Sequence, residues 1–337
     1  MTRLRPLAAL AALLIAALPA HATPPAKPGV PAVQRPITDL APIVVLTLGK
    51  TADWVEVTPG AIWVGTTGPF SVVKIDPRTN QVLGRAELPG EPCAGLAHGF
   101  GRLWVPLCGH DGAKNALAEV SLKDAHIHAI LPIGPAASEG GIAVSRDGVW
   151  MVTDKAGTLA RIDPRTGAVR QTVRLPAGSF NPIVADGLIW VTSIEGDRIT
   201  AVDARTGLVL GETSTGPKPR FLTSGANSIW TLNQGDGSIT RIDAKTRRVT
   251  ATIAAGIPGH GGDIAFGDGK VWATVSDIPL SAIAPATNTV AHQWIGPGGD
   301  SLRVAFGAIW LTDYDKGTVS RIPLSAAITP SSPRLHP

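Results

Sequence analysis

The chain has 337 residues, and its 30 Lys and Arg against 26 Asp and Glu give a formal net charge of +4 with no run of basic residues. This charge gives no electrostatic basis for binding a nucleic acid or an anionic membrane surface. The 38 glycines and 29 prolines, together with the lack of long helical periodicity, favour an all-β fold.

Residues 1–22 have the pattern of a secretory signal peptide. Arg3 and Arg5 form a basic start, an apolar run follows, and Ala-His-Ala ends at Ala22 as a small-residue cleavage site. No other stretch approaches the roughly 18 apolar residues of a transmembrane helix, so we expect no membrane span. We therefore expect a periplasmic or secreted protein, cleaved near Ala22. The proline-rich residues 23–42 predict an extended tether.

Seven tryptophans occur in similar short contexts, 38 to 46 residues apart. They are Trp63, Trp104, Trp150, Trp190, Trp230, Trp272 and Trp310. A period of about 40 residues with four short strands per unit is typical of a β-propeller blade. The repeat predicts a seven-bladed β-propeller of four-stranded antiparallel blades over residues 43–324. We expect each indole to pack between neighbouring blades rather than to stack on a ligand.

Each unit can be divided into four expected strands. An inner strand such as 262–267 leads through an Asp-Gly turn into the tryptophan strand, and a third strand such as 158–163 follows. The next turn, Asp-Pro-Arg-Thr-Gly at 163–167, recurs with variations in other units. Its Asp can accept bonds from backbone amides, its Pro presets φ and its Gly accepts a positive φ, so we interpret the turn as structural.

The two ends of the predicted propeller complement each other. The last unit stops after its third strand at 317–324, whereas residues 41–49 have the pattern of a fourth strand. The pattern predicts that residues 43–48 pair with the open edge of blade seven, which closes the ring and covers both edges. The polar residues 325–337 are expected to form a disordered tail.

Cys93 and Cys108 are the only two cysteines of the chain. With Phe100-Gly101 as a two-residue turn, Ala97 lies opposite Trp104 and the two cysteines fall opposite each other. Antiparallel partners have Cα atoms about 4.5–5.5 Å apart, which is within the range of a disulfide. Export to an oxidising compartment and the absence of a Cys-x-x-Cys motif predict a structural disulfide rather than a redox site.

The pattern Gly-x-Ile-Trp-Val-Thr followed by Val-x-Arg-Ile-Asp-Pro-x-Thr-Gly resembles the YVTN and streptogramin-lyase-like (virginiamycin B lyase-like) propellers, over residues 43 to about 324. That family includes both ring-opening lyases and exported binding or scaffolding proteins. Its lyases carry His at the starts of inner strands with a metal-binding Glu nearby. His260 and Glu139 match this pattern, His260 with a displacement of about two positions. For the lyase, the resemblance implies these two residues as catalytic, with a divalent cation such as Mg²⁺.

The candidate site lies where the inner strands begin, at the mouth of the central channel, because loops on a rigid scaffold carry function. Residues at these positions differ between units, whereas the tryptophans and turns repeat. Besides His260 and Glu139, the expected mouth residues are Asp53, Trp54, Asn181, Arg220, Asp263, Asp300 and Arg303.

Two hypotheses for the mouth remain open. In the first, a monomeric exported scaffold binds a small molecule or a protein partner there. In the second, a metal-assisted lyase or hydrolase uses His260 as general base or metal ligand, with the carboxyls as acid or metal partners and Arg220 holding an anionic group. The sequence leaves the cofactor and the metal ligands unknown.

Overall fold

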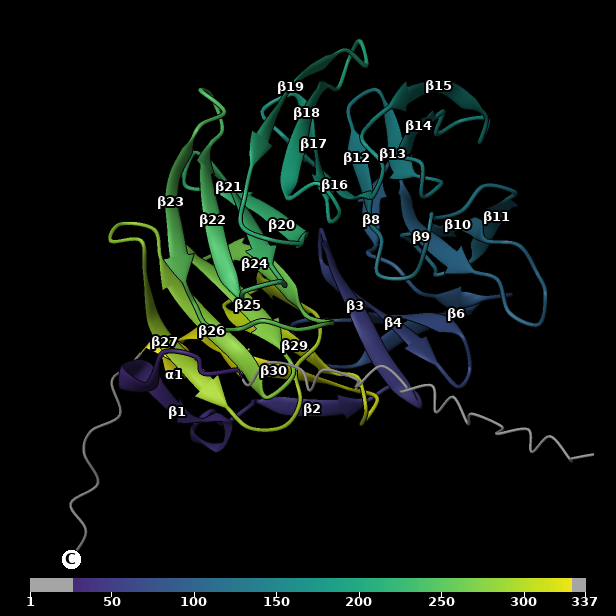
Figure 1. Cartoon of the computed structure of the whole chain (residues 1–337). Helices are drawn as coiled ribbons and strands as arrows, with labels where there is room; N and C mark the ends of the chain where they lie inside the picture. Colours follow the sequence, from purple (N-terminus) through teal and green to yellow (C-terminus); the bar gives the residue numbers. More distant parts are fainter. Residues whose placement is uncertain (1–26, 329–337) are drawn as a thin grey trace, which may run out of the picture.

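The computed structural model describes residues 27–328, which form seven sheets arranged as a ring around a central channel (Figure 1). The predicted seven-bladed β-propeller is confirmed. The signal peptide and its cleavage site lie outside the described residues, as do residues 329–337. Within residues 27–328, no helix has the length and apolar character needed to cross a membrane.

The first four blades follow one another along the chain. Blade one contains β3 (Thr51–Thr58), β4 (Ala61–Thr67), β5 (Ser71–Ile75) and β6 (Val82–Glu87). Blade two contains β7 (Glu91–Pro92), β8 (Ala97–Gly99), β9 (Arg102–Cys108), β10 (Ala116–Ser121) and β11 (Ile127–Leu131). Blade three contains β12 (Ile142–Ser145), β13 (Gly148–Val152), β14 (Thr158–Ile162) and β15 (Val169–Arg174). Blade four contains β16 (Ser179–Ala185), β17 (Leu188–Ser193), β18 (Arg198–Asp203) and β19 (Val209–Ser214).

The last three blades continue this order, and the N-terminal segment contributes to two of them. Blade five contains β20 (Pro219–Gly225), β21 (Ser228–Asn233), β22 (Ser238–Asp243) and β23 (Val249–Ala254). Blade six contains β24 (Asp263–Gly267), β25 (Lys270–Val275), β26 (Ile278–Ala284) and β27 (Thr289–Ile295), with β1 (Gln34–Pro36) added in parallel to β27. Blade seven contains β28 (Leu302–Ala305), β29 (Ala308–Asp313), β30 (Thr318–Pro323) and β2 (Val44–Thr47).

The seven tryptophans occupy the second strand of each blade and are fully buried, at 0% exposure. Several of their indole N–H groups donate to the residue five positions earlier, as Trp63 does to the Thr58 hydroxyl at 3.1 Å. Basic side chains cover some of the rings, as Arg241 covers Trp230 at 4.8 Å. The indoles are therefore core, as predicted.

The ring closes as the sequence predicts. β2 pairs antiparallel with β30, from Val44 opposite Arg321 to Thr47 opposite Thr318. Backbone bonds at both ends extend this ladder, from Ile43 N to Arg321 O and from Leu48 N to Gly317 O, each at 2.8 Å. The start of the propeller thus completes its last sheet, and blade seven keeps no open edge at β30.

The segment interpreted from its composition as a tether lies against the propeller in its described part, residues 27–42. It contains the 3₁₀ turns η1 (Pro31–Val33) and η2 (Ile37–Asp39) on either side of β1. The buried Gln293 side chain accepts the Val30 amide at 2.6 Å, and Leu40 is buried in the core of blades six and seven. At the other end, α1 (Leu324–Ile328) places Ala327 in the same core where a tail was expected.

The two faces of the ring carry different connections between strands. The turns between first and second strands share one face with the turns between third and fourth strands, as the bond from Ala204 N to Gly187 O at 3.0 Å illustrates. The loops between second and third strands share the other face with the links between blades, as the bond from Thr215 N to Asp197 O illustrates. We call the second face the mouth face, because each inner strand begins there.

Candidate binding site at the channel mouth

Hydrogen bonds between consecutive blades fix the starts of the inner strands. The Asn181 side chain on β16 donates to the carbonyls of Glu139 and Arg220, at 3.2 and 2.9 Å. Asp263 on β24 accepts from the Ser301 hydroxyl at 2.7 Å and from Arg303 at 2.6 Å. Asn181 and Asp263, both predicted mouth residues, thus join neighbouring blades, and they hold the backbone of the mouth in place.

Three carboxyl groups that the sequence placed at the mouth interact with one another. Asp53 and Asp300 share a side-chain hydrogen bond, and burial raises the pKa of each above its ordinary value. The pKa of Asp53 lies well above that value, because Asp300, Glu139 and Asp263 add to the effect of burial. Burial and then Asp300 raise the pKa of Glu139 to about 7, against the opposing charge of Arg220. We call Asp53, Glu139 and Asp300 the carboxyl cluster.

The two arginines of the mouth differ in their partners. Arg303 pairs with Asp263 at 2.6 Å and approaches Glu56 to 4.0 Å, so its charge is shared between two carboxylates. Arg220 lies over the Phe180 ring at 4.6 Å and is near enough to Glu139 to lower the pKa of that carboxyl. The carboxyl cluster therefore has Arg220 as its principal positive neighbour.

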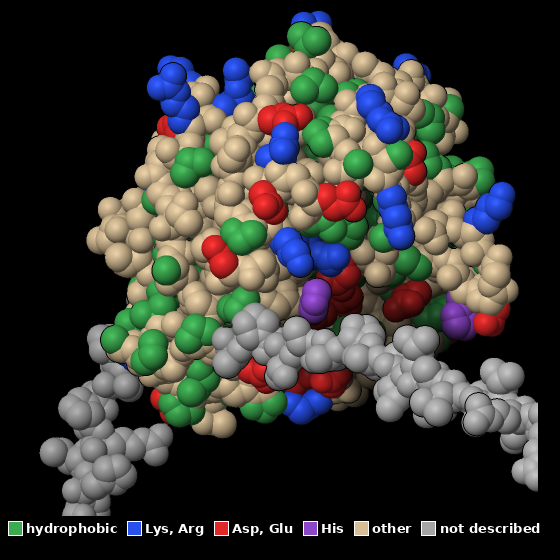
Figure 2. All heavy atoms as spheres, in the orientation of Figure 1, with side chains coloured by type: hydrophobic (Ala, Val, Ile, Leu, Met, Phe, Trp, Pro, Cys, Tyr) green, Lys and Arg blue, Asp and Glu red, His purple; other side chains and the backbone are tan. Residues whose placement is uncertain are grey.

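A cavity of about 70 Å³ among the inner strands has two aromatic residues in its wall. The rings of Trp54 and Phe221 lie 5.9 Å apart, and Asp263 and Arg303 line the same cavity. The Trp54 side chain is only 4% exposed, and its indole N–H has no hydrogen-bond partner among the described residues. Figure 2 shows acidic and basic side chains in the hollow at the centre of the ring.

Towards the opposite face, the channel contains a hydrogen-bonded pair that the sequence analysis did not single out. The His98 ring on β8 and Glu56 on β3 are hydrogen-bonded at 2.7 Å, and this bond raises the pKa of His98. Arg303 connects this pair to Asp263. The two residues lie in ordinary inner-strand positions without any motif, so only the register of neighbouring blades brings them together.

His260 stands in a sharply bent loop beside Asp300, whose carboxylate accepts the Gly262 amide at 3.4 Å. Gly259, Gly261 and Gly262 all have positive φ, at 133°, 69° and 92°, and the His260 side chain is exposed. The described residues contain no group of three or more His, Cys, Asp or Glu arranged to hold a metal ion. The residues present therefore do not fit a metal centre, and we derive no metal-assisted step.

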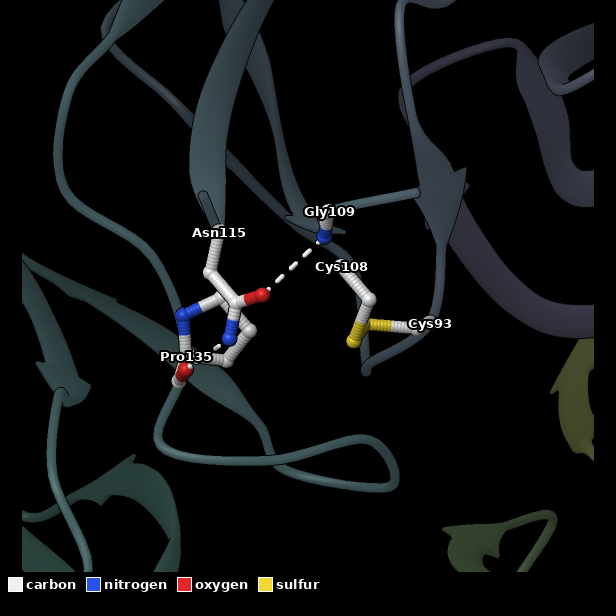
Figure 3. Close-up of a disulfide and its surroundings, with 5 residues drawn as sticks. All are labelled: Cys93, Cys108, Gly109, Asn115 and Pro135. Atoms are coloured by element: carbon white, nitrogen blue, oxygen red, sulfur yellow. Dashed lines mark hydrogen bonds between the residues drawn. A yellow bond between two sulfur atoms is a disulfide. The ribbon is translucent and has the colours of Figure 1, made fainter. Parts of the chain in front are cut away.

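The predicted disulfide between Cys93 and Cys108 is present, with Cα atoms 5.7 Å apart (Figure 3). The register predicted for it is wrong, because Glu91 rather than Cys93 lies opposite Cys108. The inner strand is interrupted between β7 and β8, where its backbone bonds to blade three instead. The Cys93 carbonyl accepts the Glu139 amide at 2.8 Å, and the Gly95 amide donates to Gly140 at 2.9 Å.

The disulfide lies beside the long loop of blade two and helps to hold it at the mouth face. The Asn115 side chain accepts the Gly109 amide at 3.0 Å and donates to the Pro135 carbonyl at 2.8 Å (Figure 3). The cross-linked segment is therefore connected to the backbone that leads to Glu139. Since Cys93 is engaged in this bond, its role at the mouth is structural.

The fold and the mouth define a seven-bladed propeller with repeated structural positions and one asymmetric, charged opening. A family model described as outer membrane protein assembly factor BamB matches residues 69–268, more than half of the chain. The chain belongs to this family. No curated protein matches it.

Solved structures of similar fold include a BamB protein. The crystal structure of BamB from Moraxella catarrhalis aligns with a TM-score of 0.58, covering 84% of this chain and 97% of that one. At 14% sequence identity, this likeness concerns the fold alone. The narrower resemblance to streptogramin-lyase-like propellers is not confirmed by these matches.

Proposed function

We propose that this chain is a periplasmic protein-binding scaffold that takes part in the assembly of outer membrane proteins and engages a protein partner through its mouth face. Membership in the BamB family supports the protein-binding class. The observation that carries the choice of the mouth is the carboxyl cluster, since half-buried carboxyls that repel one another are unfavourable for stability and need another reason to be kept.

The size of the cavity favours a protein partner over a small molecule at this site. Pockets that enclose drug-sized ligands have volumes of about 300–1,000 Å³. The cavity behind the mouth measures about 70 Å³, which accommodates the end of one side chain. A partner surface that covers the mouth face and inserts one group satisfies this geometry. No described contact favours the lyase or hydrolase alternative, and we do not propose it.

The test is complementation in the native host. Cells that lack the chain are expected to contain less folded outer membrane protein, and the wild-type gene restores it. Asp300→Asn at the mouth should fail to restore it, whereas Asp186→Asn, at an exposed hairpin turn of the opposite face, should succeed. If both variants restore folded outer membrane protein equally, at equal protein levels, the mouth is not needed for the proposed function.

A further inference from the structure

The mouth face contains a groove between blades two and three, with a volume of about 620 Å³. Three segments line it: the loop between β9 and β10, the link from β11 towards Glu139, and the loop between β13 and β14. The lining residues are 113–115, 132–136 and 153–155. We call this feature the blade 2–3 groove.

The first wall of the groove is a loop that other parts of the protein hold in place. Residues 109–115 form the longest of the seven loops between second and third strands. The His110 ring packs edge-on against Phe70 of blade one, with ring centres 5.6 Å apart. At the other end of the loop, the Asn115 side chain donates to the Pro135 carbonyl at 2.8 Å, next to the disulfide (Figure 3).

The second wall, the link 132–136, is fixed on both of its sides. A Cβ placed on Gly134 would lie 2.5 Å from backbone atoms of Asn115 and Ala116, so the link packs closely against the loop. On the side of blade three, the Ala136 amide donates to the Val152 carbonyl at 3.0 Å. The groove is therefore formed before any ligand arrives, and binding does not have to order its walls.

The groove offers unpaired positive charge. Lys114 and Lys155 line it and are exposed, and neither ammonium group has an ion-pair or hydrogen-bond partner within residues 27–328. The one carboxylate of the lining belongs to Asp154, which accepts the Thr158 amide of its own loop at 3.1 Å. Two free cations thus face one carboxylate that is already hydrogen-bonded.

The shape and composition of the groove favour a peptide segment over a small molecule. Small-molecule sites enclose about 70–90% of the ligand surface. The side chains of Lys114, Asn115 and Lys155 are exposed, so this groove is open to solvent along its rim. An extended segment can lie in an open groove and continue beyond it. Two prolines and Ile133 in the link add apolar surface for one of its side chains.

We propose that the blade 2–3 groove binds an extended acidic segment of the protein partner. Its carboxylates would lie at Lys114 and Lys155, and an apolar side chain between them would lie against the link 132–136. This inference rests on the proposed function, since it names a segment by which the partner is held. A basic segment would be repelled by the two lysines, and a neutral one would form neither ion pair.

The experiment uses the exported form of the chain, labelled with ¹⁵N, and follows the Gly134 amide and the Asn115 side-chain amide by NMR. The probes are the blocked peptide Gly-Glu-Leu-Glu-Gly, its counterparts with Gln or Lys in place of both Glu, and glutarate. We expect the Glu peptide to shift both signals in a saturable way. The Gln peptide should bind roughly fivefold more weakly, because two exposed ion pairs are lost.

Charge reversal supplies a stricter test of the same site. Lys114→Glu with Lys155→Glu should lose the Glu peptide and bind the Lys peptide instead. The matched control is Lys123→Glu with Lys245→Glu, at exposed turns of the opposite face, which should bind the Glu peptide as the wild type does. All four lysines are exposed, so neither double variant should disturb the fold.

Several results would overturn the inference. These are equal affinity for the Glu and Gln peptides, no shift with any peptide up to its solubility limit, or an equal loss of binding in the control variant. Shifts by glutarate as strong as those by the Glu peptide would instead indicate a small-molecule anion site.

The complementation assay separates this failure from that of the proposed function. If no peptide binds while Asp300→Asn fails to complement, the acidic segment is wrong and the scaffold role stands. If the Glu peptide binds as expected while cells that lack the chain assemble outer membrane proteins normally, the groove stands and the proposed function is wrong.

Discussion

Aspartates on the two faces of the ring have pKa values shifted in opposite directions. On the face away from the mouth, turn aspartates accept bonds from amides two and three residues ahead. Asp203, for example, accepts from Arg205 N at 3.1 Å and from Thr206 N at 2.7 Å. The Thr206 hydroxyl and these amides lower the pKa of Asp203. At the mouth, burial and neighbouring carboxyls raise the pKa of Asp53 and Asp300 instead.

This difference separates the aspartates that stabilise the propeller from the carboxyls that destabilise it. A lowered pKa means that folding favours the charged carboxylate, and a raised pKa means that folding disfavours it. The turn aspartates repeat from blade to blade and contribute to stability at neutral pH. The mouth carboxyls occur at single positions and reduce stability there, as expected for groups kept for binding.

The largest expected effect is at a repeated position. Trp190 is fully buried in the second strand of blade four. Trp190→Ala removes most of its apolar contacts and leaves a cavity, so the free energy of unfolding should fall by about 3–5 kcal/mol. Urea unfolding followed by circular dichroism measures this loss. A loss similar to that of an average surface substitution would contradict the structural role of the repeated indole.

The disulfide stabilises the mouth face through the blade-two segment. Replacing both cysteines, Cys93→Ser with Cys108→Ser, should lower the free energy of unfolding by about 3 kcal/mol, because a cross-link of this span restricts the unfolded chain. Urea unfolding of the double variant against oxidised wild type measures the loss. Treating the wild type with a reductant should reproduce it. If the oxidised and reduced wild-type proteins unfold at the same urea concentration, the cross-link has no such role.

At the mouth, removing a charge should stabilise the protein. The pKa of Glu139 is about 7 in the folded protein and 4.5 in a model peptide, so folding binds a proton between these values. The stability associated with Glu139 is therefore present below pH 4.5 and is lost as the pH rises to about 7. Glu139→Gln should raise the free energy of unfolding at pH 8 by about 1–3 kcal/mol, and much less at pH 5.

Comparing the free energy of unfolding of Glu139→Gln with that of the wild type at each pH isolates the contribution of the Glu139 carboxyl. The His98 pKa, raised by the bond to Glu56, gives stability that is also lost as the pH rises. A pH profile of the wild type alone would therefore mix the two groups. If Glu139→Gln destabilises the protein at pH 8, the carboxyl is a structural acceptor rather than a residue kept for binding.

The smallest effect is expected at a single turn. Asp203→Ala removes the acceptor of two backbone amides in one of several similar turns. The melting temperature should fall slightly at pH 7. The difference from wild type should shrink in acid, because the lowered pKa of Asp203 makes its stabilisation disappear as the pH falls. An equal difference at pH 3 and pH 7 would contradict this assignment.

The repeat made most of the fold predictable. A tryptophan every 40 or so residues established the blades, and the missing fourth strand of blade seven established the closure by residues 43–48. These features depend on local strand patterns, which the sequence carries directly. The cysteine register was missed because the chain between Pro92 and Ala97 leaves its own sheet and bonds to the backbone of blade three.

The sequence predicted where the mouth lies but not how its side chains contact one another. The divergent residues at inner-strand starts predicted Asp53 and Asp300, yet nothing in the sequence shows that they share a hydrogen bond. The role predicted for His260 beside Glu139 stays a prediction, because the exposed His260 side chain stands in a loop whose direction depends on glycines with positive φ. Phe221 was missed because a phenylalanine in an inner strand looks like ordinary core.

The most direct test of the account is a pH titration of the side-chain carboxyl carbons by ¹³C NMR. We expect Glu139 to titrate near pH 7 and Asp203 to titrate below its ordinary range. A Glu139 carboxyl that titrates at its ordinary value of 4.5 would contradict it.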